Sequence, residues 1–138
     1  MDIILTSLGT HNLSVCDFII NHTTDKGLLN MLFVTTGCNL LHNPDFLFDE
    51  KQRLSKTDFV VTEFDLVGKT FSEICSAVRE NDVIWVHGGK PFYLLKYIRE
   101  SRFKEALLKE GQNKVYIGQS SGSYVACPNI DMALWKSQ

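Results

Sequence analysis

Ser120 is the residue of this 138-residue chain whose surroundings best suit nucleophilic chemistry. It lies in the pentapeptide GQSSG at residues 118–122, which fits the pattern G-x-S-x-G and directly follows an apolar run at 115–117. Between a strand and a helix this pattern forms a nucleophile elbow, in which glycines allow a tight turn and the serine hydroxyl is exposed on a strained backbone. The alternative is an ordinary strand-to-helix turn that needs only glycines and N-capping serines.

Backbone amides near Ser120 could hold the negative charge that develops when its hydroxyl attacks a carbonyl carbon. The N–H of Ser121 would point from the start of the following helix toward that charge. Gly88 and Gly89 follow another apolar run, at 83–86, and amides without side chains beside them can approach an oxyanion closely. The sequence therefore predicts an oxyanion hole from Gly88, Gly89 and Ser121, although a tight turn would explain the glycine pair equally well.

A serine hydroxyl also needs a base to take its proton. The histidines of the chain all precede Ser120: His11, His22, His42 and His87. His87 and His11 lie in loops expected at the same sheet edge as Ser120, so they are the candidate substitute bases. The alternative is that His87 only ends a strand and His11 only begins a helix.

The elements that must position these residues follow from the alternation of β-rich runs with segments of helical period. Strands are predicted at 2–6, 31–36, 59–64, 83–87 and 114–118. This order predicts a doubly wound, mostly parallel α/β sheet in three layers, of the flavodoxin-like or class I glutamine amidotransferase-like kind. Functional loops in such sheets lie beyond the carboxyl ends of the strands, so loops 7–11, 87–90 and 119–123 should meet.

Apolar stripes predict the faces of the helices between these strands. One stripe joins Val15, Phe18 and Ile19, and another joins Phe71, Ile74, Cys75 and Val78. Helices are also predicted near Pro44, from Pro91 with Phe92, Leu95 and Ile98 facing inward, and from Ser101 to a cap at Gly111.

Composition narrows the function classes. A net charge of -2 and a pI near 6.0 leave no basic surplus for nucleic acid or an anionic membrane. The apolar runs are far shorter than the roughly 20 residues of a membrane span. Because no basic leader is present, we expect a cytoplasmic protein. The cysteines are scattered without a C-x-x-C pair, so we expect reduced, mostly buried thiols and no metal site.

Two stretches resemble the dipeptidase E and cyanophycinase family of serine peptidases. Residues 87–96, HGGKPFYLLK, are similar to its signature Gly-Gly-Asn-Thr-Phe-x-Leu-Leu-Lys, and residues 116–123, YIGQSSGS, are similar to its elbow Tyr-Ile-Gly-x-Ser-Ala-Gly-Ser/Ala. The spacing between the two stretches also matches. Lys90 stands in place of the asparagine and Ser121 in place of the alanine, a change that a backbone amide donor tolerates.

The resemblance implies a nucleophile at Ser120, oxyanion donors at Gly88, Gly89 and Ser121, and a small peptide substrate such as an aspartyl dipeptide. It implies no metal and no organic cofactor. In this family the catalytic histidine follows the elbow, whereas Asp131 is the single acid and no histidine follows Ser120 here. We therefore expect residues 1–138 to form one domain that lacks the C-terminal part of the family fold.

Three functional hypotheses remain open from the sequence. The chain is a truncated peptidase with weak or no activity, or a hydrolase that recruits His87, His11 or a histidine of another subunit, or a non-catalytic binding or assembly domain derived from the peptidase fold. A shortened sheet would expose apolar surface, so we also expect a homodimer or larger assembly.

Overall fold

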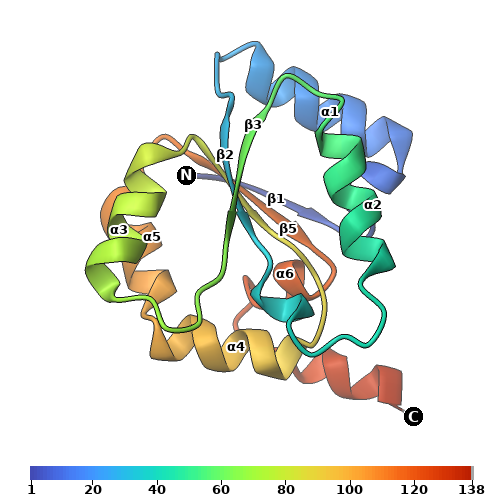
Figure 1. Cartoon of the computed structure of the whole chain (residues 1–138), viewed down its shortest axis with the longest axis vertical. Coiled ribbons are helices and arrows are strands. Elements are labelled where there is room, and N and C mark those ends of the chain that lie inside the picture. Colours follow the sequence, from blue (N-terminus) through green and yellow to red (C-terminus); the bar gives the residue numbers. More distant parts are fainter. Residues whose placement is uncertain (138) are drawn as a thin grey trace.

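The computed structural model describes residues 1–137, which form a single parallel sheet wrapped by helices (Figure 1). The strands are β1 (Asp2–Thr6), β2 (Asn30–Val34), β3 (Val60–Phe64), β4 (Val83–Val86) and β5 (Val115–Gln119). Their order across the sheet is β1-β5-β4-β2-β3, and every pairing is parallel. The five strands predicted from the sequence are confirmed, with ends that differ by at most two residues.

The central strands are apolar on both sides because helices cover both faces of the sheet. All four residues of β4 are completely buried, with Ile84 and Val86 on one face and Val83 and Trp85 on the other. Such continuous apolar runs, rather than alternating ones, are typical of a doubly wound parallel sheet.

The helices divide between the two faces of the sheet, as Figure 1 shows. α1 (Leu13–Thr24) and α2 (Asp45–Leu54) pack on one face through Ile19 and Leu54. The other face is covered by α3 (Phe71–Glu80), α4 (Pro91–Glu100) and α5 (Phe103–Glu110). Short helices complete the chain: η1 (Gly9–His11), η2 (Thr36–Cys38), α6 (Ser121–Tyr124) and η3 (Asp131–Ser137). The predicted three-layer α/β fold is therefore confirmed.

Two side chains that were predicted to face the core are exposed, although the start of α4 is where the sequence predicts it. Pro91 begins α4 as expected, but Phe92 is 51% exposed, because Leu94 and Ile98 form the buried face and Phe92 lies about 200° around the helix from Leu94. Phe18 of α1 is 58% exposed because it faces a shallow hollow beside β1 instead of the core.

The connections that leave β2 and β4 diverge at the carboxyl edge of the sheet. The chain leaves β2 outward to β3, whereas it leaves β4 in the opposite direction to β5. Ligand sites of open α/β sheets lie at such a point, beyond the carboxyl ends of the two strands. Here η2 follows β2 and the glycine pair follows β4, and they are joined by a hydrogen bond of 2.8 Å from the Lys90 N–H to the Gly37 carbonyl.

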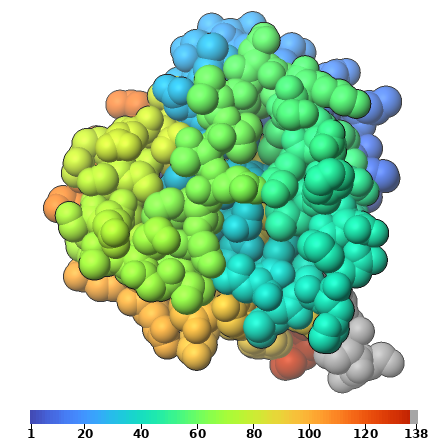
Figure 2. All heavy atoms as spheres, in the orientation of Figure 1, coloured from blue at the N-terminus to red at the C-terminus, as the bar shows by residue number. Residues whose placement is uncertain are grey.

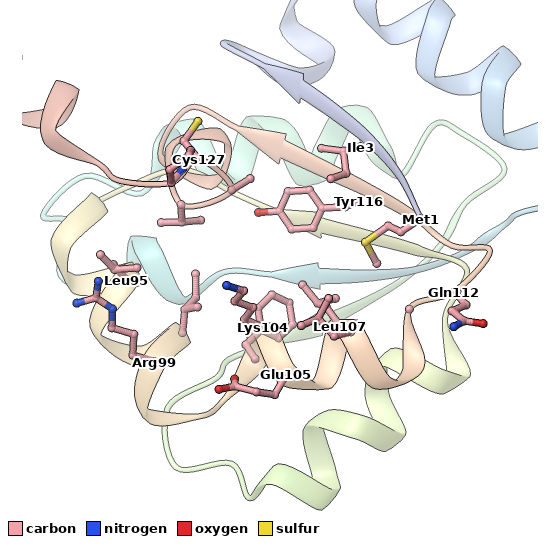
Figure 3. A pocket seen from close by; sticks show the side chains of 17 residues that line it. Met1, Ile3, Leu95, Arg99, Lys104, Glu105, Leu107, Gln112, Tyr116 and Cys127 are labelled. Atoms are coloured by element: carbon pink, nitrogen blue, oxygen red, sulfur yellow. The ribbon is translucent and has the colours of Figure 1, made fainter.

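The two edges of the sheet differ in their cover. In Figure 2 the side chains of α2 and α3 stand on either side of the β3 edge. At the other edge, β1 pairs with β5 alone among the described strands, and Ile3 and Leu5 are 59% and 48% exposed. A hollow of about 840 Å³ lies there between the sheet and α5, with Ile3, Tyr116 and Leu107 in its wall (Figure 3).

Candidate active site

Ser120 occupies a strained turn between β5 and α6. Its φ of 52° and ψ of -113° are angles that residues with a side chain rarely adopt. The turn is held at both ends: the Ser120 N–H donates to the Thr6 carbonyl at 3.0 Å, and the Ser120 carbonyl accepts from the N–H groups of Ser123 and Tyr124 at 2.8 and 3.1 Å. Within residues 1–137 the Ser120 hydroxyl has no hydrogen-bond partner, so it is available to a ligand.

A glycine at position 122 is a steric requirement of this turn. A Cβ at Gly122 would collide with the carbonyl oxygen of Val86, the last residue of β4. The first turn of α6 can therefore approach β4 only when this position has no side chain. The close approach places Ser120 next to the loop that follows β4.

That loop brings the glycine pair against the serine. A Cβ on Gly88 would lie 3.0 Å from the Ser120 Cβ and 3.5 Å from its Oγ, so Gly88 packs directly on the serine side chain. Gly89 has a φ of 131°, and its carbonyl accepts a 2.7 Å hydrogen bond from the Ser121 hydroxyl. Across the described chain, the N–H groups of Gly88, Gly89 and Ser121 donate to no protein acceptor. Unpaired amides are thus present in both loops that meet at Ser120.

The two candidate bases have different environments. His87 is 2% exposed, and its ring contacts Phe33 and Phe46 edge-on. Burial lowers the pKa of His87, which keeps its imidazole neutral near pH 7. His11 ends η1 and is exposed. Neither ring is hydrogen-bonded to Ser120 within residues 1–137.

A buried polar network supports the turn from the α2 side. Glu50 is completely buried and accepts hydrogen bonds from the Thr10 N–H at 3.1 Å, the Thr10 hydroxyl at 2.7 Å and the Arg53 guanidinium at 2.8 Å. Gln119, which directly precedes Ser120, reaches Glu50 at 3.4 Å and accepts from the Trp85 indole at 3.1 Å. The network ties α2, η1, β4 and β5 together behind the serine.

Sequence reasoning missed this network. Glu50 stands among charged residues in the segment 49–53, DEKQR, where an exposed position is the ordinary expectation. Its burial follows from the packing of α2 against the loop after β1, a contact between residues 40 apart in the chain. Among residues 1–137 no group of three His, Cys, Asp or Glu side chains could hold a metal ion, and no helix has the length and apolar character to cross a membrane.

Comparison with known proteins identifies relatives of this chain. The model of peptidase family S51 matches residues 3–136. An uncharacterized peptidase of Listeria monocytogenes is 35% identical over 99 residues, which are 71% of this chain and 48% of the relative. An uncharacterized peptidase of Pasteurella multocida is 26% identical over 103 residues, 74% of this chain and 50% of the relative.

Solved structures agree with the sequence relatives. A candidate peptidase E protein from Listeria monocytogenes superposes with a TM-score of 0.81 at 26% identity, covering 94% of this chain and 63% of that one. A peptidase from an acI-B1 actinobacterium superposes with a TM-score of 0.59 at 16% identity, covering 88% of this chain and 55% of that one, and shares the fold. The chain spans about half the length of the curated relatives it matches.

Proposed function

Because the chain belongs to peptidase family S51, we propose that it is a serine-type peptidase domain of the dipeptidase E kind, with Ser120 as the nucleophile. One observation carries the assignment: a serine on a strained strand-to-helix turn has a free hydroxyl, packs against Gly88, and lies in loops where the amides of Gly88, Gly89 and Ser121 are unpaired. An ordinary N-capping serine would use its hydroxyl on its own helix, whereas the Ser120 side chain makes no capping hydrogen bond.

In the proposed reaction, the Ser120 Oγ bonds to the carbonyl carbon of a peptide while a base takes the hydroxyl proton. The carbonyl oxygen becomes an oxyanion, which accepts hydrogen bonds from the amides of Gly88, Gly89 and Ser121. The amine leaves with a proton, and water then releases the acyl group from Ser120 by the same steps. The proposed substrate is a small peptide such as an aspartyl dipeptide, and no metal or organic cofactor takes part.

The proposal leaves open which group takes the proton from the Ser120 hydroxyl. His87 and His11 remain the candidates within the chain, and a histidine of another chain is the third. Burial lowers the pKa of His87, which weakens it as a proton acceptor. We therefore expect hydrolysis of aspartyl dipeptides by this chain alone to be absent or very low. A non-catalytic binding or assembly domain is the alternative function, and the free Ser120 hydroxyl without a hydrogen-bonded base favours it.

Labelling with a fluorophosphonate probe tests the nucleophile directly. We expect covalent labelling of the wild type that is lost in Ser120→Ala and retained in Cys127→Ala, because Cys127 follows α6 and its thiol donates to the Ser123 carbonyl at 3.6 Å. Dipeptide turnover measured alongside distinguishes the bases. Robust turnover that disappears in His11→Ala, or that disappears in His87→Ala without recovery in His87→Asn, but survives in Lys90→Ala, would show that a histidine of this chain has been recruited. Equal labelling of all variants would reject Ser120.

The open β1 edge supports a second part of the proposal, which is self-association. Asp2 bonds through its N–H to Lys114 at 3.0 Å, so the alternate residues Ile3 and Leu5 turn their backbone groups away from β5. An apolar strand edge of this kind pairs readily with another chain. We therefore propose a homodimer. We also propose a cytoplasmic location, since all four cysteines are free thiols.

A further inference from the structure

Cys38 and His87 form a buried pair whose contacts point to a role other than that of a base. The thiol is 7% exposed and the imidazole 2% exposed. The Cys38 Sγ lies 3.2 Å from the His87 Nδ1, and both atoms lie 3.3 Å from the carbonyl oxygen of Gly88. Three polar groups therefore form a closed triangle at the point where η2 meets the loop after β4.

The pair is neutral and is suited to hydrogen bonding rather than to reaction. Burial raises the pKa of Cys38 to about 11 and lowers the pKa of His87, so neither a thiolate nor an imidazolium is favoured near pH 7. The thiol donates to the Gly88 carbonyl, and a proton on Nδ1 can be donated to the sulfur or to the same carbonyl. The His87 Nε2 then carries no proton, which agrees with its buried position without a partner.

An anchored carbonyl determines the direction of the next amide. The peptide between Gly88 and Gly89 is planar and trans, so its C=O and N–H point in opposite directions. Because the Gly88 oxygen points toward Cys38 and His87, the N–H of Gly89 points away from them. The following carbonyl, that of Gly89, is held by the Ser121 hydroxyl at 2.7 Å. Both peptide planes around Gly89 are therefore held by side chains.

We propose that Cys38 and His87 are positioning residues that hold the Gly88–Gly89 peptide with its N–H directed at the oxyanion beside Ser120. Glycines rotate freely, and a φ of 131° at Gly89 is one of many conformations open to such a pair. Without the two donors, the peptide can flip and present an oxygen where the oxyanion needs a donor. The role of the amide rests on the proposed function, whereas its orientation can be measured independently.

Nuclear magnetic resonance of the Gly89 amide tests the orientation without any need for activity. We expect a clear change of the Gly89 amide chemical shift in Cys38→Ala and His87→Ala, and a largely wild-type signal in His87→Asn, whose side-chain amide can donate where Nδ1 does. Cys75→Ala is the matched control, because Cys75 is 4% exposed but packs on the opposite face of the sheet. An unchanged Gly89 signal in both alanine variants would overturn the proposal.

The rate of fluorophosphonate labelling tests the consequence for chemistry. Loss of one oxyanion donor lowers acyl-transfer rates by about 100- to 1000-fold, so a displaced donor should slow the covalent step by roughly 10- to 100-fold in the two alanine variants, with little change in probe affinity. His87→Asn should recover most of the rate. Wild-type protein that resists the probe would reject the proposed nucleophile while the amide measurement still decides the orientation. A slowing shared by Cys75→Ala would indicate general destabilisation and would count against positioning.

Discussion

The turn at Ser120 and the outer edge of β1 are neighbours in the sheet, but they differ in how well their backbone and apolar groups are covered by other parts of the chain. Around Ser120, carbonyls and amides of three loops are bonded to one another, including Ser120 to Thr6 and Lys90 to Gly37. Along β1, Ile3 and Leu5 remain exposed, and Ile3 lines an open hollow. The difference shows that a strained turn can be well supported by hydrogen bonds inside a sheet whose edge strand remains exposed.

This difference arises because the two regions are supported by different strands. The turn depends mainly on β5, β4 and β2, which are interior strands with partners on both sides, and it contacts β1 through the last residue of that strand, Thr6. The edge depends on whatever pairs with β1, and the described chain supplies nothing there. Three variants test this comparison, two near the turn and one at the edge.

The largest effect is expected from Gly122→Ala at the turn. The new Cβ would collide with the backbone carbonyl of Val86, which cannot move without disrupting β4. We expect a loss of about 3–4 kcal/mol in the free energy of unfolding, measured with denaturant. The matched control is Gly68→Ala, because Gly68 has a φ of 76° but open space around its Cβ. Its cost should be about 1 kcal/mol, from backbone strain alone. Similar losses in both variants would show that close packing at the turn is unimportant.

An intermediate effect is expected from Ile3→Lys at the edge. A buried isoleucine contributes about 1.5–3 kcal/mol to association, so the dimer dissociation constant should rise roughly 10- to 100-fold. Sedimentation at several concentrations measures it. Val60→Lys is the matched control, since Val60 is 61% exposed on the opposite edge strand, β3. A monomeric wild type at micromolar concentration, or an equal effect of both variants, would contradict pairing through β1.

The smallest effect is expected in the pH dependence of stability. Above the ordinary His pKa of 6.5 the His87 ring is neutral in both the folded and unfolded states and contributes no pH dependence. Below it, the unfolded ring binds a proton first, because burial lowers the folded pKa despite the opposing effects of the Gly88 carbonyl and Glu50. Stability should therefore fall as pH decreases from 6.5 toward the folded pKa.

A comparison of variants assigns that decrease to His87. Unfolding of His87→Asn, followed between pH 7 and pH 5, should show a shallower decrease than the wild type. His42→Asn, which removes an exposed ring, should keep the wild-type slope. A wild-type slope in His87→Asn would mean that the buried ring is protonated as easily in the folded state as in the unfolded state.

Local patterns determined much of this protein by themselves. The alternation of apolar runs and helical stripes predicted the five strands and the three layers, because burial on both faces demands continuous apolar strands. The pattern G-x-S-x-G after an apolar run located the strained serine, because such a turn excludes a Cβ at its flanks. These signals act over a few residues, so a single sequence can reveal them.

Tertiary structure alone decided which distant groups support the turn. The contact of Cys38 with His87 joins residues 49 apart, and that of Glu50 with Gln119 joins residues 69 apart. Neither pair has a spacing that predicts proximity, because their meeting depends on the strand order β5-β4-β2 and on the packing of α2. The exposure of Phe92 could not be predicted either, because the packing of α4 on the sheet decides which of its residues are buried. Residue types determine which groups can donate, accept or be buried, whereas the order of strands determines which of them meet.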